Sequence, residues 1–329
     1  MKYPRIEGGR KLTSFVSPMK AQLSDLLAFD NKDWLFEIKW DGYRAIAEIS
    51  NKEVKLYSRN GLTFDKAYPK VFEALKAIKG DVVLDGEIVV YGEDGKPSFQ
   101  KLQNYKNTDR YPIQYLVFDC LALKGRDLTR LSLVERKAIL KKFLPESPVV
   151  MYCDHVEDYG KAFFAEVKKI GLEGIIAKKK LSTYQIGKRT SDWLKIKNVQ
   201  GQEAIIVGYT EPKGSRSHFG SLVLAVKNKG KLVPIGNVGT GFTDRSLKEV
   251  YAKLKPLVRK TSPLDAPAKD AADVTWVEPT LVCNIRFTEM TEDGSVRHPV
   301  FEGLRVDKMA AEVVLEKPKK GKTVKGRKS

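Results

Sequence analysis

The sequence predicts an α+β protein with two domains, a larger mixed domain followed by a small β-barrel. Its length of 329 residues and 42% hydrophobic content allow two separate cores, at about 150 residues a domain. Patterns typical of strands and of helices are mixed over the first two-thirds of the chain. After about residue 200 the pattern changes to strands joined by Gly-rich turns, with one helix among them. We therefore expect a mixed domain over residues 1–199 and a barrel over residues 200–316.

The segment "FEIKWDGYRAIAEI", residues 36–49, alternates apolar and polar side chains. Period-two alternation predicts a strand with Glu37, Lys39 and Asp41 on one face. Gly42 allows a sharp turn directly afterwards. A lysine between two acids is typical of an ordinary half-solvated edge strand, and it is also an arrangement in which a lysine can act as a nucleophile.

Three helices are predicted in the larger domain. Residues 68–80 form the first, with Pro69 in its first turn and Gly80 at its C-terminus. Residues 132–144 form the second, which begins with a capping box of Ser132 and Glu135. Residues 159–171 form the third. Strands are predicted between them, over residues 81–92, 115–123, 173–179 and 192–197.

Two of these strands carry charged residues on one face. Asp85 and Glu87 share a face in "VLDGEIVV", and Lys195 and Lys197 share a face with Trp193 in "DWLKIK". Solvated sheet faces produce either pattern by themselves. Two acids on one strand and two lysines on another, in a domain that also carries Lys39, indicate a site for a metal-bound polyphosphate.

The second domain contains strands over residues 203–210, 221–239 and 280–291, a helix over 244–260 and a loop over 261–273. About five strands with an inserted helix match an OB-fold barrel. We expect the boundary near "NVQGQ", residues 198–202. Residues 317–329, "KPKKGKTVKGRKS", carry seven Lys and Arg and no acid, and we expect this tail to be disordered.

The chain carries a net charge of +18, and it stays strongly basic without the tail. This excess favours a nucleic-acid partner. An anionic membrane surface is the competing partner, but the sequence has no basic amphipathic helix with an aromatic face, no apolar run of membrane-spanning length and no secretory signal. The three cysteines are far apart, which argues against a zinc ribbon and a disulfide framework and favours a cytoplasmic protein.

Six short motifs in order make the sequence similar to the ATP-dependent DNA ligases, a family within the nucleotidyltransferase superfamily. The first motif most resembles that of the ligase module of bacterial end-joining ligases. A single KxDG would be weak support, whereas the ordered set covers most of the chain. The motifs are "KWDGYR" (39–44), "SRNG" (58–61), "DGEIV" (85–89), "EGIIAKK" (173–179), "WLKIK" (193–197) and "RVDK" (305–308).

The resemblance implies that Lys39 attacks the α-phosphate of ATP and forms a lysyl–AMP phosphoramidate. Only the neutral amine is a nucleophile, so we expect the pKa of Lys39 to fall well below its ordinary value through burial and cationic neighbours. The cationic residues expected to do this are Lys178, Arg189, Lys195 and Lys197.

The same resemblance assigns the other site residues. Glu37 would read the adenine edge, Phe118 would stack on the ring, and Arg44 and Arg59 would hold ribose and phosphate. Glu87 and Glu173 would ligate Mg²⁺, with Mn²⁺ as an alternative metal. In the barrel, Arg305, Asp307 and Lys308 would orient the β- and γ-phosphates.

One assignment conflicts with strand periodicity. Glu173 and Lys178 have opposite parity in a regular strand, so placing both in one pocket requires a turn or bulge at Gly174.

The expected substrate is nicked double-stranded DNA, bound by a monomer with no membrane association. A Ku-like end-binding protein or another repair protein in trans is a hypothesis from the same likeness, as is association with the nucleoid in a bacterium. RNA ligation and mRNA capping with GTP share the chemistry and stay open, as does a non-catalytic basic DNA-binding protein.

Overall fold

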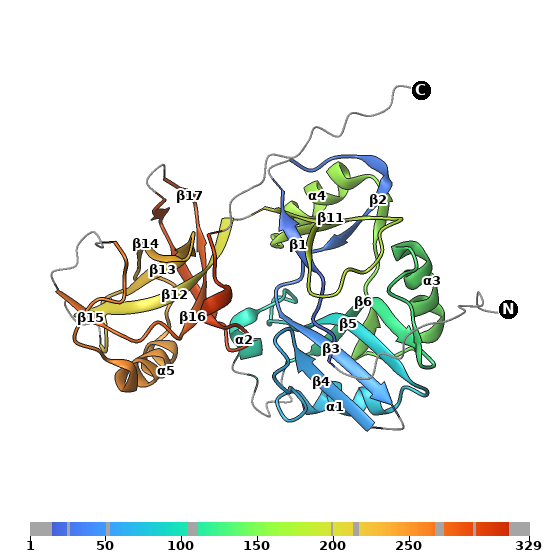
Figure 1. The fold of residues 1–329 in the computed structure, drawn as a ribbon, viewed down its shortest axis with the longest axis horizontal. Coiled ribbons are helices and arrows are strands. Elements are labelled where there is room, and N and C mark those ends of the chain that lie inside the picture. The colour runs from blue at the N-terminus through green and yellow to red at the C-terminus, as the bar shows by residue number, and fades with distance from the viewer. Residues whose placement is uncertain are drawn as a thin grey trace. The chain divides into compact units, whose positions relative to one another are not determined.

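The computed structural model describes residues 15–24, 27–50, 53–103, 105, 111–198, 200–212, 217–266, 273–291 and 294–315. The predicted disordered tail, residues 317–329, lies outside this part of the chain. The contacts divide the chain into two compact units, the first reaching Asn198 and the second spanning Val199–Glu316 (Figure 1). No helix in the described part is long and apolar enough to cross a membrane.

Two sheets form the first unit. The six-stranded sheet has the order β4-β3-β5-β6-β7, with β8 beside β6. Its strands are β3 (Tyr43–Ser50), β4 (Glu53–Ser58), β5 (Val82–Val90), β6 (Ile113–Leu123), β7 (Arg126–Asp127) and β8 (Val150–Tyr152). The five-stranded sheet has the order β1-β11-β10-β2-β9. Its strands are β1 (Lys20–Leu23), β2 (Asn31–Ile38), β9 (Val156–Asp158), β10 (Gly174–Lys179) and β11 (Arg189–Lys197).

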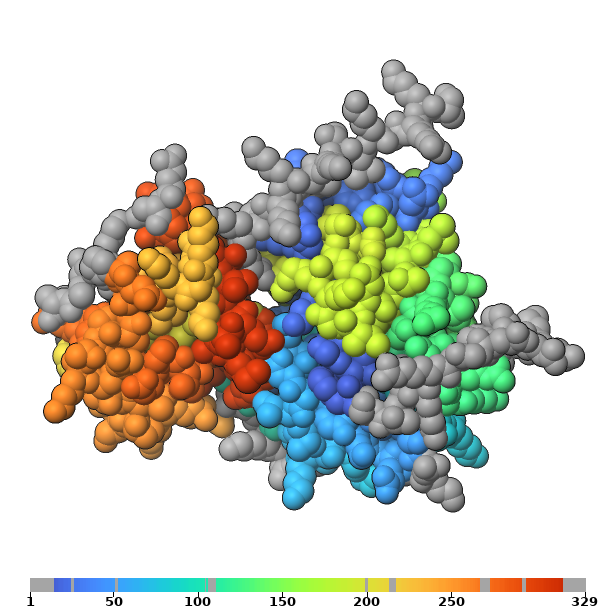
Figure 2. Space-filling model, viewed as in Figure 1, coloured from blue at the N-terminus to red at the C-terminus, as the bar shows by residue number. Residues whose placement is uncertain are grey.

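Segments far apart in sequence therefore lie side by side in the five-stranded sheet. β1 runs parallel to β11, which follows it by more than 160 residues, and Leu23 pairs with Lys195. In Figure 2 the blue surface near β1 adjoins the yellow-green surface of β10 and β11.

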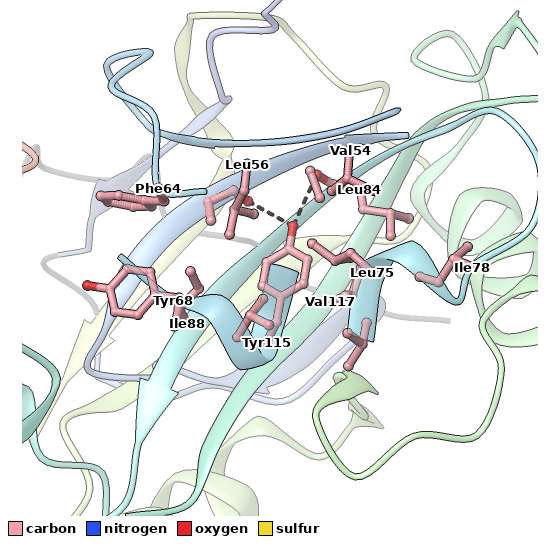
Figure 3. Close-up of a cluster of buried hydrophobic side chains, with 14 of the residues drawn as sticks. Val54, Leu56, Phe64, Tyr68, Leu75, Ile78, Leu84, Ile88, Tyr115 and Val117 are labelled. Atoms are coloured by element: carbon pink, nitrogen blue, oxygen red, sulfur yellow. Dashed lines mark hydrogen bonds between the residues drawn. The ribbon is translucent and has the colours of Figure 1, made fainter. Parts of the chain in front are cut away.

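Three apolar layers hold this unit together. One lies between the two sheets and includes Ile46, Phe118 and Trp193. A second packs on the other face of the six-stranded sheet. It surrounds Tyr115, whose hydroxyl donates to the carbonyls of Ala45 (2.9 Å) and Leu84 (3.2 Å) (Figure 3). The third covers the outer face of the five-stranded sheet. Side chains at the edge of the middle layer can thus be held from two sheets at once.

The helices of this unit are α1 (Pro69–Lys76), α2 (Phe99–Gln103), α3 (Leu133–Phe143) and α4 (Gly160–Lys169). The predicted end of the first helix at Gly80 is wrong. α1 ends at Lys76 with Ala77 as its C-cap, and Gly80 lies in the following turn with φ +98°. The predicted capping box of α3 is confirmed, since the backbone N–H of Ser132 donates to Glu135 (2.9 Å).

The prediction of one continuous strand through Lys39 and Asp41 is also wrong. β2 ends at Ile38 in the five-stranded sheet, and β3 begins at Tyr43 in the six-stranded sheet. The four residues between them, Lys39–Gly42, carry the chain from one sheet to the other. A side chain at Gly42 would collide with the carbonyl oxygen of Ile88, so the crossover requires glycine there.

The second unit is a curled sheet with the order β14-β13-β12-β16-β19 and β15 beside β12. Just after β14, Thr240 forms a β-bridge with Val300 at the start of β19. This contact closes the barrel. The predicted OB-type barrel with one inserted helix is thereby confirmed, while β19 was not predicted. Its elements are β12 (Gln200–Thr210), β13 (Leu222–Asn228), β14 (Lys231–Val238), α5 (Asp244–Leu254), a 3-10 turn (Lys255–Leu257), β15 (Val274–Trp276), β16 (Val282–Phe287), β17 (Glu289–Met290), β18 (Val296–Arg297), β19 (Val300–Leu304) and a second 3-10 turn (Ala310–Glu312).

Candidate active site

Lys39 lies at the crossover between the two sheets of the first unit. Its backbone N–H donates to the carbonyl of Gly174 (2.9 Å), and its ammonium group donates to the Glu173 carboxylate. Both contacts come from the start of β10, in the same sheet as β2. The lysine is therefore fixed by its backbone and by its side chain to one point of the five-stranded sheet.

Gly174 has the irregular conformation that the opposite parity of Glu173 and Lys178 requires. Its φ is +149°, and a side chain there would collide with the carbonyl oxygen of Ile196. Glu173 consequently reaches Lys39, while Lys178 reaches the buried Glu37. The two residues enter one cluster from a strand that is regular after Gly174.

The electrostatics of Lys39 differ from the expectation. Burial alone would lower its pKa, but the Glu173 carboxylate, followed by Asp41 and Glu87, raises the pKa above its ordinary value. Burial would raise the pKa of Glu173, and Lys39, Lys197 and Lys195 together hold it low. The expected fall in the pKa of Lys39 is therefore wrong for the protein by itself, because the acids around it outweigh the effect of burial.

Glu37 lies at the centre of a buried charge cluster. Its side chain is 2% exposed, and its two oxygens lie 2.6 Å from the ammonium groups of Lys137 and Lys178. Burial would raise its pKa, but Lys137 and then Lys178 bring it below its ordinary value. Both carboxylate oxygens of the residue expected to read adenine are thus in contact with lysines.

The Phe118 ring also has charged neighbours. The guanidinium of Arg44 lies 4.7 Å from its centroid and the ammonium of Lys178 lies 4.2 Å from it. Asp85 accepts two hydrogen bonds from Arg44, each 2.6 Å, and a third from the Tyr184 hydroxyl (2.6 Å). Burial would lower the pKa of Arg44, and Asp85 raises it. Arg44 is thereby held against the ring as a permanent cation.

The remaining predicted residues of the first unit fall into two groups. Lys195 and Lys197 on β11 lower the pKa of Glu173. Glu87 on β5 raises the pKa values of Lys39 and Arg44. Arg189 begins β11, six residues before Lys195, and donates to the carbonyl of Ala21 (2.5 Å).

Arg59 lies in the turn after β4 and is half-buried. Of the predicted cations on β11, Lys195 and Lys197 thus lie close enough to Glu173 to lower its pKa, whereas Arg189 lies at the other end of the strand.

The "RVDK" motif belongs to the second unit. Arg305 and Asp307 form two hydrogen bonds with each other, of 2.8 and 2.7 Å, and Asp307 is buried. Lys308 pairs with Glu203 on β12. Each charge of the motif has a partner within the barrel.

Sequence reasoning missed the contribution of α3 and its surroundings. Lys137 contacts Glu37, and Arg136 makes a fully buried pair with Asp119 (2.7 Å). A signal was present, because Arg136 and Lys137 follow Leu133 by three and four residues and precede Leu140 by four and three. They thus occupy the apolar stripe of the helix. Charged residues at such positions require buried counter-charges.

The carboxylates near Lys39 suit a Mg²⁺ ion only if phosphate oxygens supply further ligands. No group of three or more His, Cys, Asp or Glu side chains that could hold a metal occurs within the described ranges. Glu87 and Glu173 both lie near Lys39. Mg²⁺ commonly takes one or two carboxylates together with substrate phosphate oxygens. The two carboxylates fit that arrangement.

Two family models match the chain. Residues 15–197 match the ATP dependent DNA ligase domain, and residues 215–308 match the ATP dependent DNA ligase C terminal region.

Two curated relatives are multifunctional non-homologous end joining proteins called LigD. The chain is 40% identical to the protein from Pseudomonas aeruginosa over 296 residues, which cover 87% of this chain and 35% of that protein. It is also 40% identical to the protein from Mycolicibacterium smegmatis over 305 residues, covering 91% and 40%. The chain thus spans well under half of these relatives.

Among experimental structures, a mycobacterial DNA ligase D complexed with ATP is 35% identical, with a TM-score of 0.68. The match covers 91% of this chain and 98% of that one. The ligase domain of LigD from M. tuberculosis matches over the same share of both chains with a TM-score of 0.52.

Proposed function

The chain belongs to the family of ATP-dependent DNA ligases, and we propose on that premise that it seals nicks between a 3′-OH and a 5′-phosphate in double-stranded DNA. The observation that carries this proposal is the position of Lys39. It lies at the crossover between two sheets, with Glu173, Asp41 and Glu87 around its amine. A lysine with carboxylates that can share a metal with a triphosphate suits attack on phosphorus.

The proposed reaction has three steps. The neutral amine of Lys39 attacks the α-phosphorus of ATP, the bond to the β-phosphate oxygen breaks, and pyrophosphate leaves. The AMP then passes to the 5′-phosphate of the nick. Attack by the 3′-OH joins the strand and releases AMP.

Proton removal from Lys39 is the first requirement of this scheme. Glu173 and its neighbours raise the pKa of Lys39 in the protein alone. We propose that Glu87 and Glu173 ligate Mg²⁺ together with the phosphates, and that the metal supplies positive charge beside the amine. Glu173 would then no longer hold Lys39 as an ammonium ion, because a carboxylate that binds a metal interacts less with the lysine.

The nucleotide would occupy the edge of the layer between the sheets. Phe118 and Arg44 offer a ring and a guanidinium, and Lys178, Lys195 and Lys197 offer cations for phosphate. Binding of adenine and ribose by Glu37 and Arg59 is proposed on the family resemblance. Arg189 would need to leave the carbonyl of Ala21 to take part.

The barrel would act in the first step and again on DNA. We propose that Arg305 and Lys308 stabilise the charge that develops on pyrophosphate, with Asp307 orienting Arg305. Residues 198–202 would serve as the hinge.

We also propose a cellular role, a protein partner and a location. The names of the relatives support a role in end joining, with a Ku-like protein in trans, for a ligase that is itself a monomer. Three free, buried cysteines, Cys120, Cys153 and Cys283, support a cytoplasmic location.

Incubation with α-labelled ATP or GTP, followed by a denaturing gel, separates the candidate functions. A DNA ligase gives an AMP-linked band, a capping enzyme gives a GMP-linked band, and a non-catalytic DNA-binding protein gives none. Sealing of nicked, cohesive and blunt DNA, with nicked RNA as the comparison, then identifies the substrate. Failure to join any DNA would overturn the proposal.

A further inference from the structure

Three charged side chains form a buried row in the first unit, in the order Lys137, Glu37, Lys178. Glu37 contacts each lysine at 2.6 Å, and all three side chains are at most 3% exposed. They come from α3, β2 and β10, elements that meet at the edge of the layer between the sheets. One carboxylate thus forms ion pairs with two ammonium groups at a position from which water is excluded.

The two lysines have different surroundings. Lys137 has a second acceptor, the carbonyl of Cys153 at 3.1 Å. Lys178 lies between two aromatic rings, 4.2 Å from the centroid of Phe118 and 4.1 Å from that of Trp193. Lys137 is therefore fixed by two oxygens, whereas Lys178 is attached to one oxygen and faces rings on its other sides.

With both lysines protonated, the row carries one net positive charge, because Glu37 balances only one of them. Burial, together with the charge of Lys137, lowers the pKa of Lys178. The neighbouring pairs Arg44–Asp85 and Arg136–Asp119 are balanced within themselves. A buried excess charge is unfavourable until an anion approaches it. If Lys137 were absent, Glu37 would neutralise Lys178 and no excess would remain.

We propose that Lys137 is a positioning residue that makes the charge of Lys178 available to the phosphates of the bound nucleotide. Lys137 holds Glu37 and satisfies its charge, so that Lys178 can turn toward a phosphate oxygen without leaving a buried carboxylate unpaired. This rests on the proposed function, since it takes a nucleoside triphosphate as the ligand of the site.

The test compares Lys137→Met with a matched control. Methionine has a similar length and no charge. Lys141→Met makes the same change one turn further along α3, where the side chain is 67% exposed. Both lysines lie over the Tyr152 ring, Lys137 at 4.8 Å and Lys141 at 5.4 Å from its centroid. Tripolyphosphate and adenosine are used separately as competitors of ATP in lysyl–AMP formation, because the first has only phosphates and the second has none.

The expected result is selective. Lys137→Met should weaken inhibition by tripolyphosphate about tenfold, which is the effect of one charge-assisted contact. It should weaken inhibition by adenosine less, because only tripolyphosphate requires the charge of Lys178. Lys141→Met should change neither. Equal losses for both competitors would mean that Lys137 only supports the fold of the pocket, and no loss for either would also overturn the proposal.

The double variant Lys137→Met/Glu37→Gln gives a second and opposite test. It removes the acid together with Lys137, so Lys178 regains an unbalanced charge, and inhibition by tripolyphosphate should recover to within about threefold. The double variant has no buried carboxylate to satisfy but leaves Lys178 without an acid, so the melting temperatures of both variants are measured and only folded preparations are compared. Continued weak inhibition in a folded double variant would contradict the proposal. Failure of the unaltered protein to form lysyl–AMP would instead overturn the proposed function.

Discussion

Lys39 donates a hydrogen bond to Glu173, a residue 134 positions further along the chain. The contact joins the crossover that follows β2 to the irregular start of β10, where Gly174 has φ +149°. It also sets the charge state of Lys39, since Glu173 is the acid that does most to raise the pKa of the amine. A ligand that changes the environment of Glu173 would therefore change the reactivity of Lys39.

Replacing Lys39 should abolish labelling by α-labelled ATP. Lys39→Ala removes the amine, and Lys39→Arg substitutes a guanidinium that stays protonated and is a poor nucleophile. The melting temperature should change little, because the side chain is 21% exposed and Glu173 keeps Lys195 and Lys197 as cationic neighbours. Labelling of either folded variant would disprove that Lys39 is the nucleophile.

Substitutions in the barrel motif should affect the two half-reactions unequally. Arg305→Ala or Lys308→Ala should reduce self-adenylation at least tenfold and largely spare sealing of a nick that already carries AMP, because pyrophosphate is present only in the first step. Arg286→Ala is the control, since Arg286 is an exposed barrel arginine paired with Glu302. Equal losses in both assays would assign the motif to DNA binding or barrel stability.

Binding to nicked DNA should be tolerant of sequence and should weaken steeply with salt, because each neutralised phosphate releases counterions. Deleting residues 317–329 should lower affinity and leave adenylation unchanged. The measurements are a salt titration of binding and the labelling reaction on the same preparation. Poor adenylation by the shortened protein would show that the tail belongs to the adenylation domain.

The stability of the protein should depend on pH through Glu37. The pKa of Glu37 lies below its ordinary value of 4.5. Its contribution is therefore present above that value and is lost as the pH falls through the lowered pKa. Glu37→Gln should cost about 3 kcal/mol in the free energy of unfolding at pH 7, since it leaves two buried lysines without an acid. The difference from the unaltered protein should shrink below pH 4.

Urea unfolding at pH 7 and pH 3.5 checks this prediction. Glu166→Gln on α4 is the control, because Glu166 is 70% exposed and its contact with Lys169 lies at the surface, where such pairs contribute little. A difference for Glu37→Gln that is the same at both pH values would show that its charge does not stabilise the fold.

Much of the fold could be predicted because its signals are local. The capping box at Ser132 and the face shared by Trp193, Lys195 and Lys197 depend on neighbouring residues, and the structure has both. The strand through Lys39 was mispredicted for the opposite reason. Alternation continues across residues 36–41, while the chain changes sheets after Ile38, and a change of sheet depends on pairing partners that lie far away in sequence.

The charge cluster at Glu37 could be predicted only in part. Its acid lies in a recognisable motif, whereas Lys137 comes from a helix exactly one hundred residues later. A lysine on a helix usually faces solvent, and only its place between Leu133 and Leu140 indicates otherwise. The direction in which the pKa of Lys39 is shifted could not be predicted either, because it depends on how closely three acids approach the amine.

The most direct test of the proposed ligase mechanism is transfer of AMP from the isolated, adenylated protein. The protein is labelled with α-labelled ATP, freed of nucleotide and mixed with nicked DNA and Mg²⁺. The label should leave the protein, and joined strands should appear in about equal amount without fresh ATP. Label that remains on the protein, or joining that requires added ATP, would contradict it.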